Sequence, residues 1–252
     1  MAADGTEEHV TLKLMVMKGK KKVVIAEAGK EFVDILFSFL TLPLGTIARL
    51  VREESKVEPP ELALSSLYQS VQNLDDGYLC TDTCREMLLR PRNSMEAYCR
   101  RLELNIDDTE PTEYFVCNNL ITCSYTSPVM LSTFKNENCR CGCMLAKRIS
   151  AETSYGFVKK FVDPISYTNN NGKGYLKGPT TYMVTDDLVV TPSSSISVMS
   201  LVSSMSIPVD DLKEKVVSIG TEEGVRILQA SLSSTSVLTL GLSHLTKVKE
   251  DN

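Results

Sequence analysis

The chain has 252 residues, of which 42% are hydrophobic and 23% are charged, so it can bury a substantial core without disulfides. Its 27 basic and 32 acidic residues give a net charge of −5, which argues against a general nucleic-acid binder because such proteins need a basic face. No apolar run approaches the ~20 residues that span a bilayer, so the sequence also argues against a membrane protein.

The first ten residues, MAADGTEEHV, lack the basic start and the apolar stretch of a secretory signal. We therefore expect a cytoplasmic protein, with the nucleus left open. In a reducing compartment the eight cysteines are expected to be thiols or metal ligands rather than disulfides.

Residues 10–79 are predicted to form a hairpin followed by three helices. Two β-branched runs, VTLKLMVM and KVVIAEA, flank a lysine-rich turn that we expect to be solvated. An apolar stripe at helical spacing runs from Phe32 to Leu40, and Pro43 then suits the start of the helix LGTIARLVREE. The third helix is predicted in ELALSSLYQSVQNL.

Residues 80–177 are predicted to be a cysteine-rich, zinc-ribbon-like insert followed by a flexible loop in SYTNNNGKGYLKG, residues 166–178. The insert holds all eight cysteines: Cys80, Cys84, Cys99, Cys117, Cys123, Cys139, Cys141 and Cys143. Two hairpin tips can each supply two of the four thiolates that a tetrahedral structural zinc needs. We predict Cys117, Cys123, Cys139 and Cys141 as the ligands, with Cys143 as an alternative to Cys139. Gly142 would let backbone N–H groups turn toward a sulfur. Packed thiols and a redox switch are the alternative interpretations.

Residues 178–247 are predicted to be a second copy of the unit in residues 10–79. Pro208 lies 165 positions after Pro43, and the same spacing relates six apolar pairs: Val33 and Val198, Leu36 and Leu201, Phe37 and Val202, Leu40 and Met205, Leu42 and Ile207, Leu44 and Val209. The copy would comprise the hairpin runs TTYMV and DLVVTP, a helix from Ile196 to Met205, a helix VDDLKEKVVSI ending at Gly220, and a helix EEGVRILQASLSS.

The predicted fold class is therefore α+β, with a β-β-α-α-α unit present twice. Because one hairpin alone is marginal in water, we expect both hairpins to join one sheet. The two copies would then form one pseudo-symmetric domain around the insert.

The search for catalytic residues gives none. The two histidines, His9 and His244, lie near the ends of the chain and are interpreted as surface residues. The pair Asp186-Asp187 fits turn chemistry, and Asp210-Asp211 fits the first turn of a helix. No Walker loop, HExxH or GxSxG motif is present.

Four segments resemble the plant family called domain of unknown function 674: VIAEAGKEFVDILFSFLTLPLGTIARL, SLYQSVQNLDDGYL, YMVTDDLVVTPSSSIS and LQASLSSTSVLT. The cysteine segment is similar to the middle region of that family, although Cys143 and the serine-rich PSSSISVMS depart from its pattern. The resemblance spans about residues 10 to 242. It implies the architecture and a plant origin, and it implies no activity.

The sequence thus favours a non-enzymatic intracellular interaction protein with a protein partner and one structural zinc. One alternative is an enzyme with an unrecognised site between the two copies. The other is a thiol-based redox sensor.

Overall fold

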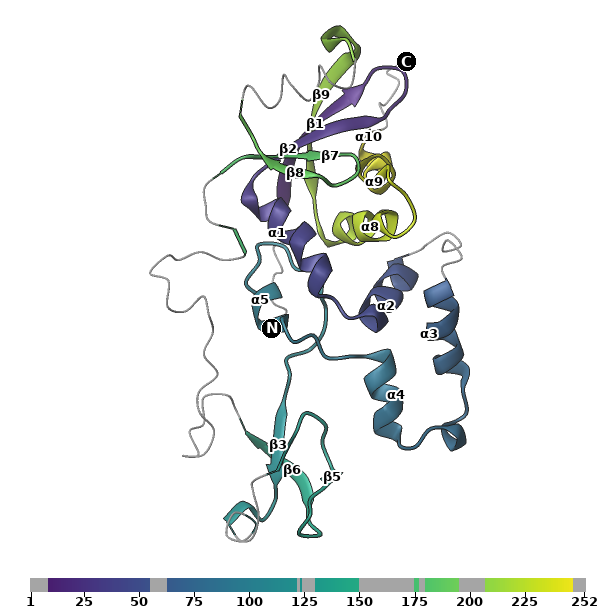
Figure 1. Cartoon of the computed structure of the whole chain (residues 1–252), viewed down its shortest axis with the longest axis vertical. Coiled ribbons are helices and arrows are strands. Elements are labelled where there is room, and N and C mark those ends of the chain that lie inside the picture. The colour runs from purple at the N-terminus through teal and green to yellow at the C-terminus, as the bar shows by residue number, and fades with distance from the viewer. Residues whose placement is uncertain are drawn as a thin grey trace, which may run out of the picture.

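The structure is a computed structural model that describes residues 9–54, 63–121, 123, 130–149, 175–176, 180–194 and 207–246. These residues form an α+β fold with two antiparallel sheets (Figure 1). The larger sheet and its helices make up one end of the molecule, and the smaller sheet lies at the other end.

The larger sheet has five antiparallel strands in the order β8 (Val190–Pro192), β7 (Tyr182–Thr185), β2 (Val23–Ala28), β1 (Val10–Met17) and β9 (Leu212–Ile219). The hairpins β1–β2 and β7–β8 are joined by pairing between β2 and β7, which runs from Ile25 opposite Thr185 to Ala28 opposite Tyr182. The prediction that both hairpins share one sheet is therefore confirmed.

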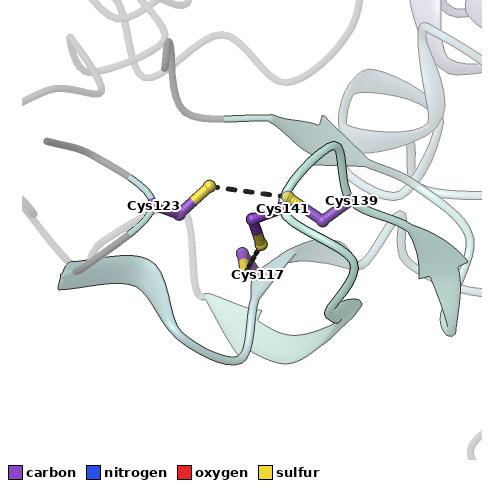
Figure 2. A group of neighbouring side chains, drawn as sticks. All are labelled: Cys117, Cys123, Cys139 and Cys141. Atoms are coloured by element: carbon purple, nitrogen blue, oxygen red, sulfur yellow. Dashed lines mark hydrogen bonds between the residues drawn. The ribbon is translucent and has the colours of Figure 1, made fainter. Parts of the chain in front are cut away.

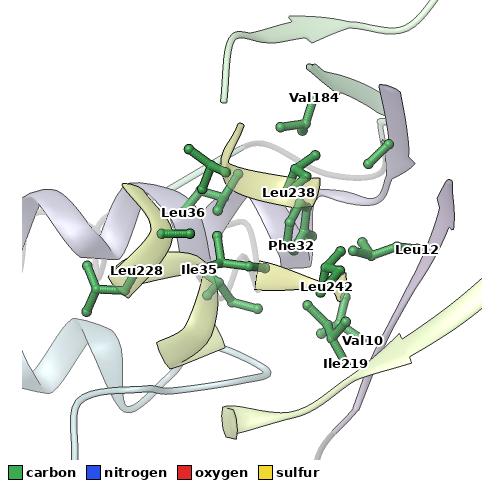
Figure 3. Close-up of a cluster of buried hydrophobic side chains, with 14 of the residues drawn as sticks. Val10, Leu12, Phe32, Ile35, Leu36, Val184, Ile219, Leu228, Leu238 and Leu242 are labelled. Atoms are coloured by element: carbon green, nitrogen blue, oxygen red, sulfur yellow. The ribbon is translucent and has the colours of Figure 1, made fainter. Parts of the chain in front are cut away.

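The main hydrophobic core lies between this sheet and four helices, α1 (Lys30–Ser38), α2 (Leu44–Glu54), α8 (Thr221–Ser231) and α9 (Val237–Gly241). Alternate residues of β1 point into the core because successive side chains of a strand face opposite sides. Figure 3 shows Leu12 from β1 near Phe32 from α1 and Leu238 from α9. Phe32, Leu12 and Leu238 are each fully buried.

Helices continue from α1 toward the smaller sheet. After a 3-10 turn at Phe39–Thr41 come α2 (Leu44–Glu54), α3 (Ala63–Asn73), α4 (Asp82–Leu89) and α5 (Glu96–Cys99). Pro43 directly precedes α2, as predicted, and its carbonyl accepts a hydrogen bond from the backbone N–H of Ile47 at 3.0 Å. The three helices predicted in residues 10–79 are confirmed.

Among the described residues, no single helix is both long enough and apolar enough to cross a bilayer. Residues Lys30–Thr41 and Leu44–Glu53 satisfy that test only as a pair, by length and composition, and the pair is bent by 119°. In its first half, Phe32, Val33 and Ile35 are buried in the main core.

The prediction of a helix in VDDLKEKVVSI is wrong. Val209–Asp211 forms a short 3-10 turn, and the rest of the segment is strand β9, which pairs with β1 from Met17 opposite Leu212 to Val10 opposite Ile219. The strand buries Val217 and Ile219 and leaves Val216 exposed, as expected for an edge strand with one face on the core.

Because β9 is a strand, the element order of residues 178–247 differs from the predicted repeat. In the described part of residues 178–247 the order is β7, β8, β9, α8, α9 and α10 (Ser243–Thr246), so the β-β-α-α-α order of residues 10–79 does not recur. The helix predicted from Ile196 to Met205 lies outside the described residues, as does most of the predicted loop at 166–178.

Gly220 begins a helix rather than ending one. Its backbone N–H donates a 2.8 Å hydrogen bond to Glu223 Oε2, and Glu223 Oε1 contacts His244 Nε2 at 2.9 Å. Burial pushes the pKa of Glu223 upward, but the hydrogen bonds from Gly220 and His244 outweigh it and hold this pKa below its ordinary 4.5. The carboxylate therefore caps α8 and links it to α10.

Glu223→Ala is expected to lower the free energy of unfolding at pH 7 by about 1 kcal/mol, the usual effect of losing a helix cap. Because the pKa of Glu223 is lower in the folded state, its contribution is complete above about pH 4.5 and is lost as the pH falls through the folded-state pKa. Urea denaturation at pH 7 and pH 3 measures both effects. The control is Glu222→Ala, which removes a half-exposed i,i+4 pair with Arg226, and equal losses for the two variants would contradict the cap.

Candidate metal centre

The smaller sheet has four short antiparallel strands in the order β4 (Leu131–Ser132), β3 (Tyr114–Cys117), β6 (Met144–Ile149) and β5 (Glu137–Asn138). Cys117 is the last residue of β3, and Cys123 follows in the next turn. Cys139 and Cys141 lie in the connection between β5 and β6. Two separate connections thus supply two cysteines each, as the sequence predicts.

The four sulfur atoms of Cys117, Cys123, Cys139 and Cys141 all lie within 4.8 Å of one another (Figure 2). The Sγ atoms of Cys117 and Cys141 are 3.5 Å apart, and those of Cys123 and Cys139 are also 3.5 Å apart. A tetrahedral zinc with Zn–S bonds of ~2.3 Å places its sulfurs ~3.8 Å apart, so the arrangement fits this ion closely. A disulfide would need ~2.05 Å, and all four residues are free cysteines.

The turn that carries Cys139 and Cys141 is closed by backbone hydrogen bonds. The N–H of Gly142 donates to the Cys139 carbonyl at 2.9 Å, and the N–H of Cys139 donates to the Cys143 carbonyl at 2.8 Å. Gly142 has φ of +84°, a conformation that glycine adopts at low cost. The turn directs a backbone hydrogen bond from Cys143 to the Cys141 sulfur, as predicted for Gly142.

The other connection makes the same kind of contact, because the backbone of Asn119 hydrogen-bonds to the Cys117 sulfur. In both cases the donor lies two residues after the cysteine. Hydrogen bonds to ligand atoms are the usual support of a metal centre, since they orient the ligand and stabilise its negative charge.

The thiols have very different pKa values. Burial raises the pKa of Cys117 to about 11, and the hydrogen bond to Cys139 together with burial raises that of Cys123 to about 12. The backbone hydrogen bond from Cys143 lowers the pKa of Cys141 to about 6. Of the three, Cys141 therefore ionises most readily. A bound cation would require thiolates at its ligand positions.

The core of the smaller sheet is small and consists largely of the cysteines. Its buried members are Phe115, Cys117, Cys123, Cys139 and Leu145. Packing as small hydrophobes explains why three of the four cysteines are buried. It does not explain Cys141, which is exposed and still points its sulfur at the group.

The remaining cysteines lie outside this group. Cys143 packs beside it and is half-buried, so Cys139 and not Cys143 completes the four. Cys80 is exposed, and Cys84 lies in the first turn of α4. Cys99 is buried elsewhere, with its Sγ atom 3.7 Å from Thr41 Oγ1.

The smaller sheet is attached to the helices by polar contacts. Thr83 Oγ1 in α4 donates to Glu137 Oε1 at 2.9 Å. Arg92 donates to the Thr133 carbonyl at 3.4 Å and lies over the Phe134 ring, 5.8 Å from its centroid. These contacts hold the cysteine group at a defined position relative to α4.

A hollow of about 540 Å³ lies where the turns of the two hairpins meet, lined by Met17, Lys22, Val23, Val24, Thr185, Asp186, Asp187, Ile207, Thr235 and Ser236. Asp186 has a structural role. Its Oδ1 accepts a hydrogen bond from the N–H of Thr239 at 2.8 Å, and its backbone carbonyl accepts one from the N–H of Val237 at 2.8 Å. The expected turn role of Asp186 and Asp187 is confirmed. No described histidine or cysteine lines this hollow.

The sequence alone singles out the four cysteines. It does not indicate which sulfur of one connection lies next to which sulfur of the other, and it does not indicate the hydrogen bond from Asn119. The spacing of cysteines along the chain carries no signal for either feature, because both depend on how β3 and β6 pair.

A family model described as "Protein of unknown function (DUF674)" matches residues 6–159 and 152–222 of this chain. No curated protein and no solved structure matched in the parallel comparisons. The two matched segments cover most of the chain, including β1, β2, the helices α1–α5, the cysteine group and the β7–β8 hairpin. The chain therefore belongs to the DUF674 family of proteins of unknown function.

Proposed function

We propose that Cys117, Cys123, Cys139 and Cys141 hold one structural zinc ion and that the protein is a non-enzymatic interaction module. The observation that carries the zinc site is the convergence of four sulfurs within 4.8 Å from two connections of one small sheet. The backbone hydrogen bonds to Cys117 and Cys141 support it, because packed apolar thiols need no such donors.

Zinc is the favoured ion because soft thiolates in a tetrahedral set select zinc or iron over hard cations. Four protein ligands leave no open position for water or substrate, so the ion would stabilise rather than catalyse. Structural zinc contributes on the order of 10–16 kcal/mol of apparent binding energy in isolated peptides. That is sufficient to order a sheet whose buried core has five members among the residues that the structure describes.

A role in binding a protein partner is supported by exposed apolar side chains near α3 and α4. Leu67, Tyr78, Met87 and Leu88 are each at least half exposed, and Tyr78 reaches 80%. Exposed apolar groups of this size are typical of interaction surfaces when they are contiguous. The enzyme alternative has less support, because Asp186, which lines the hollow between the hairpins, accepts a hydrogen bond from the N–H of Thr239 in α9 through its Oδ1.

Metal analysis of protein purified without chelator tests the zinc site. We expect about one zinc per chain by elemental mass spectrometry. A chelator should release the zinc and expose about four thiols, while Cys99 stays protected until denaturation because it is fully buried away from the site. The matched control, Cys80→Ser, should keep its zinc. Protein that lacks metal and in which every thiol except that of the buried Cys99 reacts contradicts the zinc site.

A further inference from the structure

Cys141 differs from the other three members of the group because it is exposed to solvent. Cys117, Cys123 and Cys139 are between 1% and 4% exposed. Two residues after Cys141 lies a fifth thiol, Cys143, which is half-buried and packs against the same cluster without belonging to the group of four. The group thus has one accessible member with a spare thiol beside it.

The backbone holds these two cysteines in a tight turn. Gly142 between them has φ of +84°, and the Cys143 carbonyl accepts the N–H of Cys139 at 2.8 Å. Gly142 alone separates Cys141 from Cys143, and both cysteines lie in the turn that backbone hydrogen bonds close.

From this arrangement we propose that Cys141 and Cys143 form an oxidisable pair at the open edge of the metal centre, which a peroxide converts to a disulfide with release of the metal. The release of metal rests on the proposed zinc site. The pairing itself rests on the exposure of Cys141 and on the spare thiol.

The peroxide is the oxidant that accepts the two electrons lost when the disulfide forms. The Cys141 thiolate attacks one peroxide oxygen, so that an S–O bond forms, the O–O bond breaks, and hydroxide leaves. The Cys143 sulfur then attacks the sulfenic sulfur of Cys141, so that the S–S bond forms and the S–O bond breaks. The departing hydroxide takes the Cys143 proton and leaves as water. Two sulfurs lose two electrons in total, and the peroxide gains them.

The spare thiol determines whether the oxidation can be reversed. A disulfide is reduced again by thiol exchange, after which Cys141 can rebind the ion. Without Cys143, continued oxidation takes the sulfenic acid to sulfinic acid, which thiols do not reverse. Cys143 would therefore protect the site and make it a switch.

Peptide mass analysis tests this pairing directly. Trypsin cleaves after Arg140 and Lys147 and releases CGCMLAK, which holds Cys141 and Cys143, whereas Cys139 falls on the separate peptide NENCR. After peroxide treatment of the zinc protein, we expect CGCMLAK to be two hydrogen atoms lighter and bound zinc to fall by about tenfold or more. Fragment ions distinguish this product from oxygen added to Met144. A thiol reductant with added zinc should restore both values.

Cys143→Ser should contain as much zinc as wild type before treatment, because Cys143 is not a ligand. After peroxide its peptide should gain two oxygens at Cys141, and reductant should not restore the zinc. Cys84→Ser is the matched control and should behave as wild type.

Two results would overturn the inference: a disulfide that joins other cysteines, or an oxidised Cys141 in wild type that has not paired with Cys143. Absence of zinc before treatment is a different result, since it refutes the metal site and the proposed release whatever the peptide shows.

Discussion

Replacing Cys139 with serine is expected to remove most of the zinc that we propose this group to hold and to unfold the smaller sheet. Cys139 is 4% exposed and its sulfur lies 3.5 Å from that of Cys123, so a serine hydroxyl there would be a poor ligand and a buried polar group in a small core. Elemental mass spectrometry measures the zinc. Hydrogen exchange measures protection of β3 and β6, which should fall to the level of the chelated wild-type protein.

The control for this variant is Cys80→Ser, which changes an exposed cysteine outside the group and should keep both the zinc and the protection. Strands β1 and β2 should stay protected in both variants, because the main core shares no residue with the core of the smaller sheet. Retention of a full zinc content by Cys139→Ser would show that another residue completes the site, with Cys143 as the first to examine.

Phe32→Ala is expected to lower the free energy of unfolding of the main sheet by about 3–5 kcal/mol. The Phe32 ring is fully buried between α1 and the helices at the end of the chain, so the substitution leaves a cavity in addition to losing apolar burial (Figure 3). Chemical denaturation followed by circular dichroism measures the loss.

Leu40→Ala is the matched control for the core substitution. Leu40 follows the same helix but is 88% exposed, so its replacement should change the free energy of unfolding by less than about 0.5 kcal/mol. If Leu40→Ala lowers the free energy of unfolding as much as Phe32→Ala does, then another surface must cover Leu40. Both variants should keep their zinc, which separates damage to the main core from damage to the metal site.

Local patterns in the sequence were sufficient for much of the fold. The alternation in VTLKLMVM and the apolar run in KVVIAEA identify the β1–β2 hairpin, since a strand with one buried face must alternate. Helical spacing and Pro43 identify α1 and α2, because these signals act within one or two turns of the chain. The four cysteines that converge could also be selected from the sequence, because a tetrahedral thiolate site would restrict the choice of residues.

The tertiary structure decided what depends on distant partners. The segment from Val209 to Ile219 contains both a helical start signal and an apolar alternation, and pairing with the edge of β1, about two hundred positions earlier, selects the strand. For the same reason Gly220 begins α8. The approach of Cys123 to Cys139, and the exposure of Cys141 beside Cys143, follow from the pairing of β3 with β6. Composition and spacing along the chain determined which residues could form the site, but strand pairing across long separations determined their geometry.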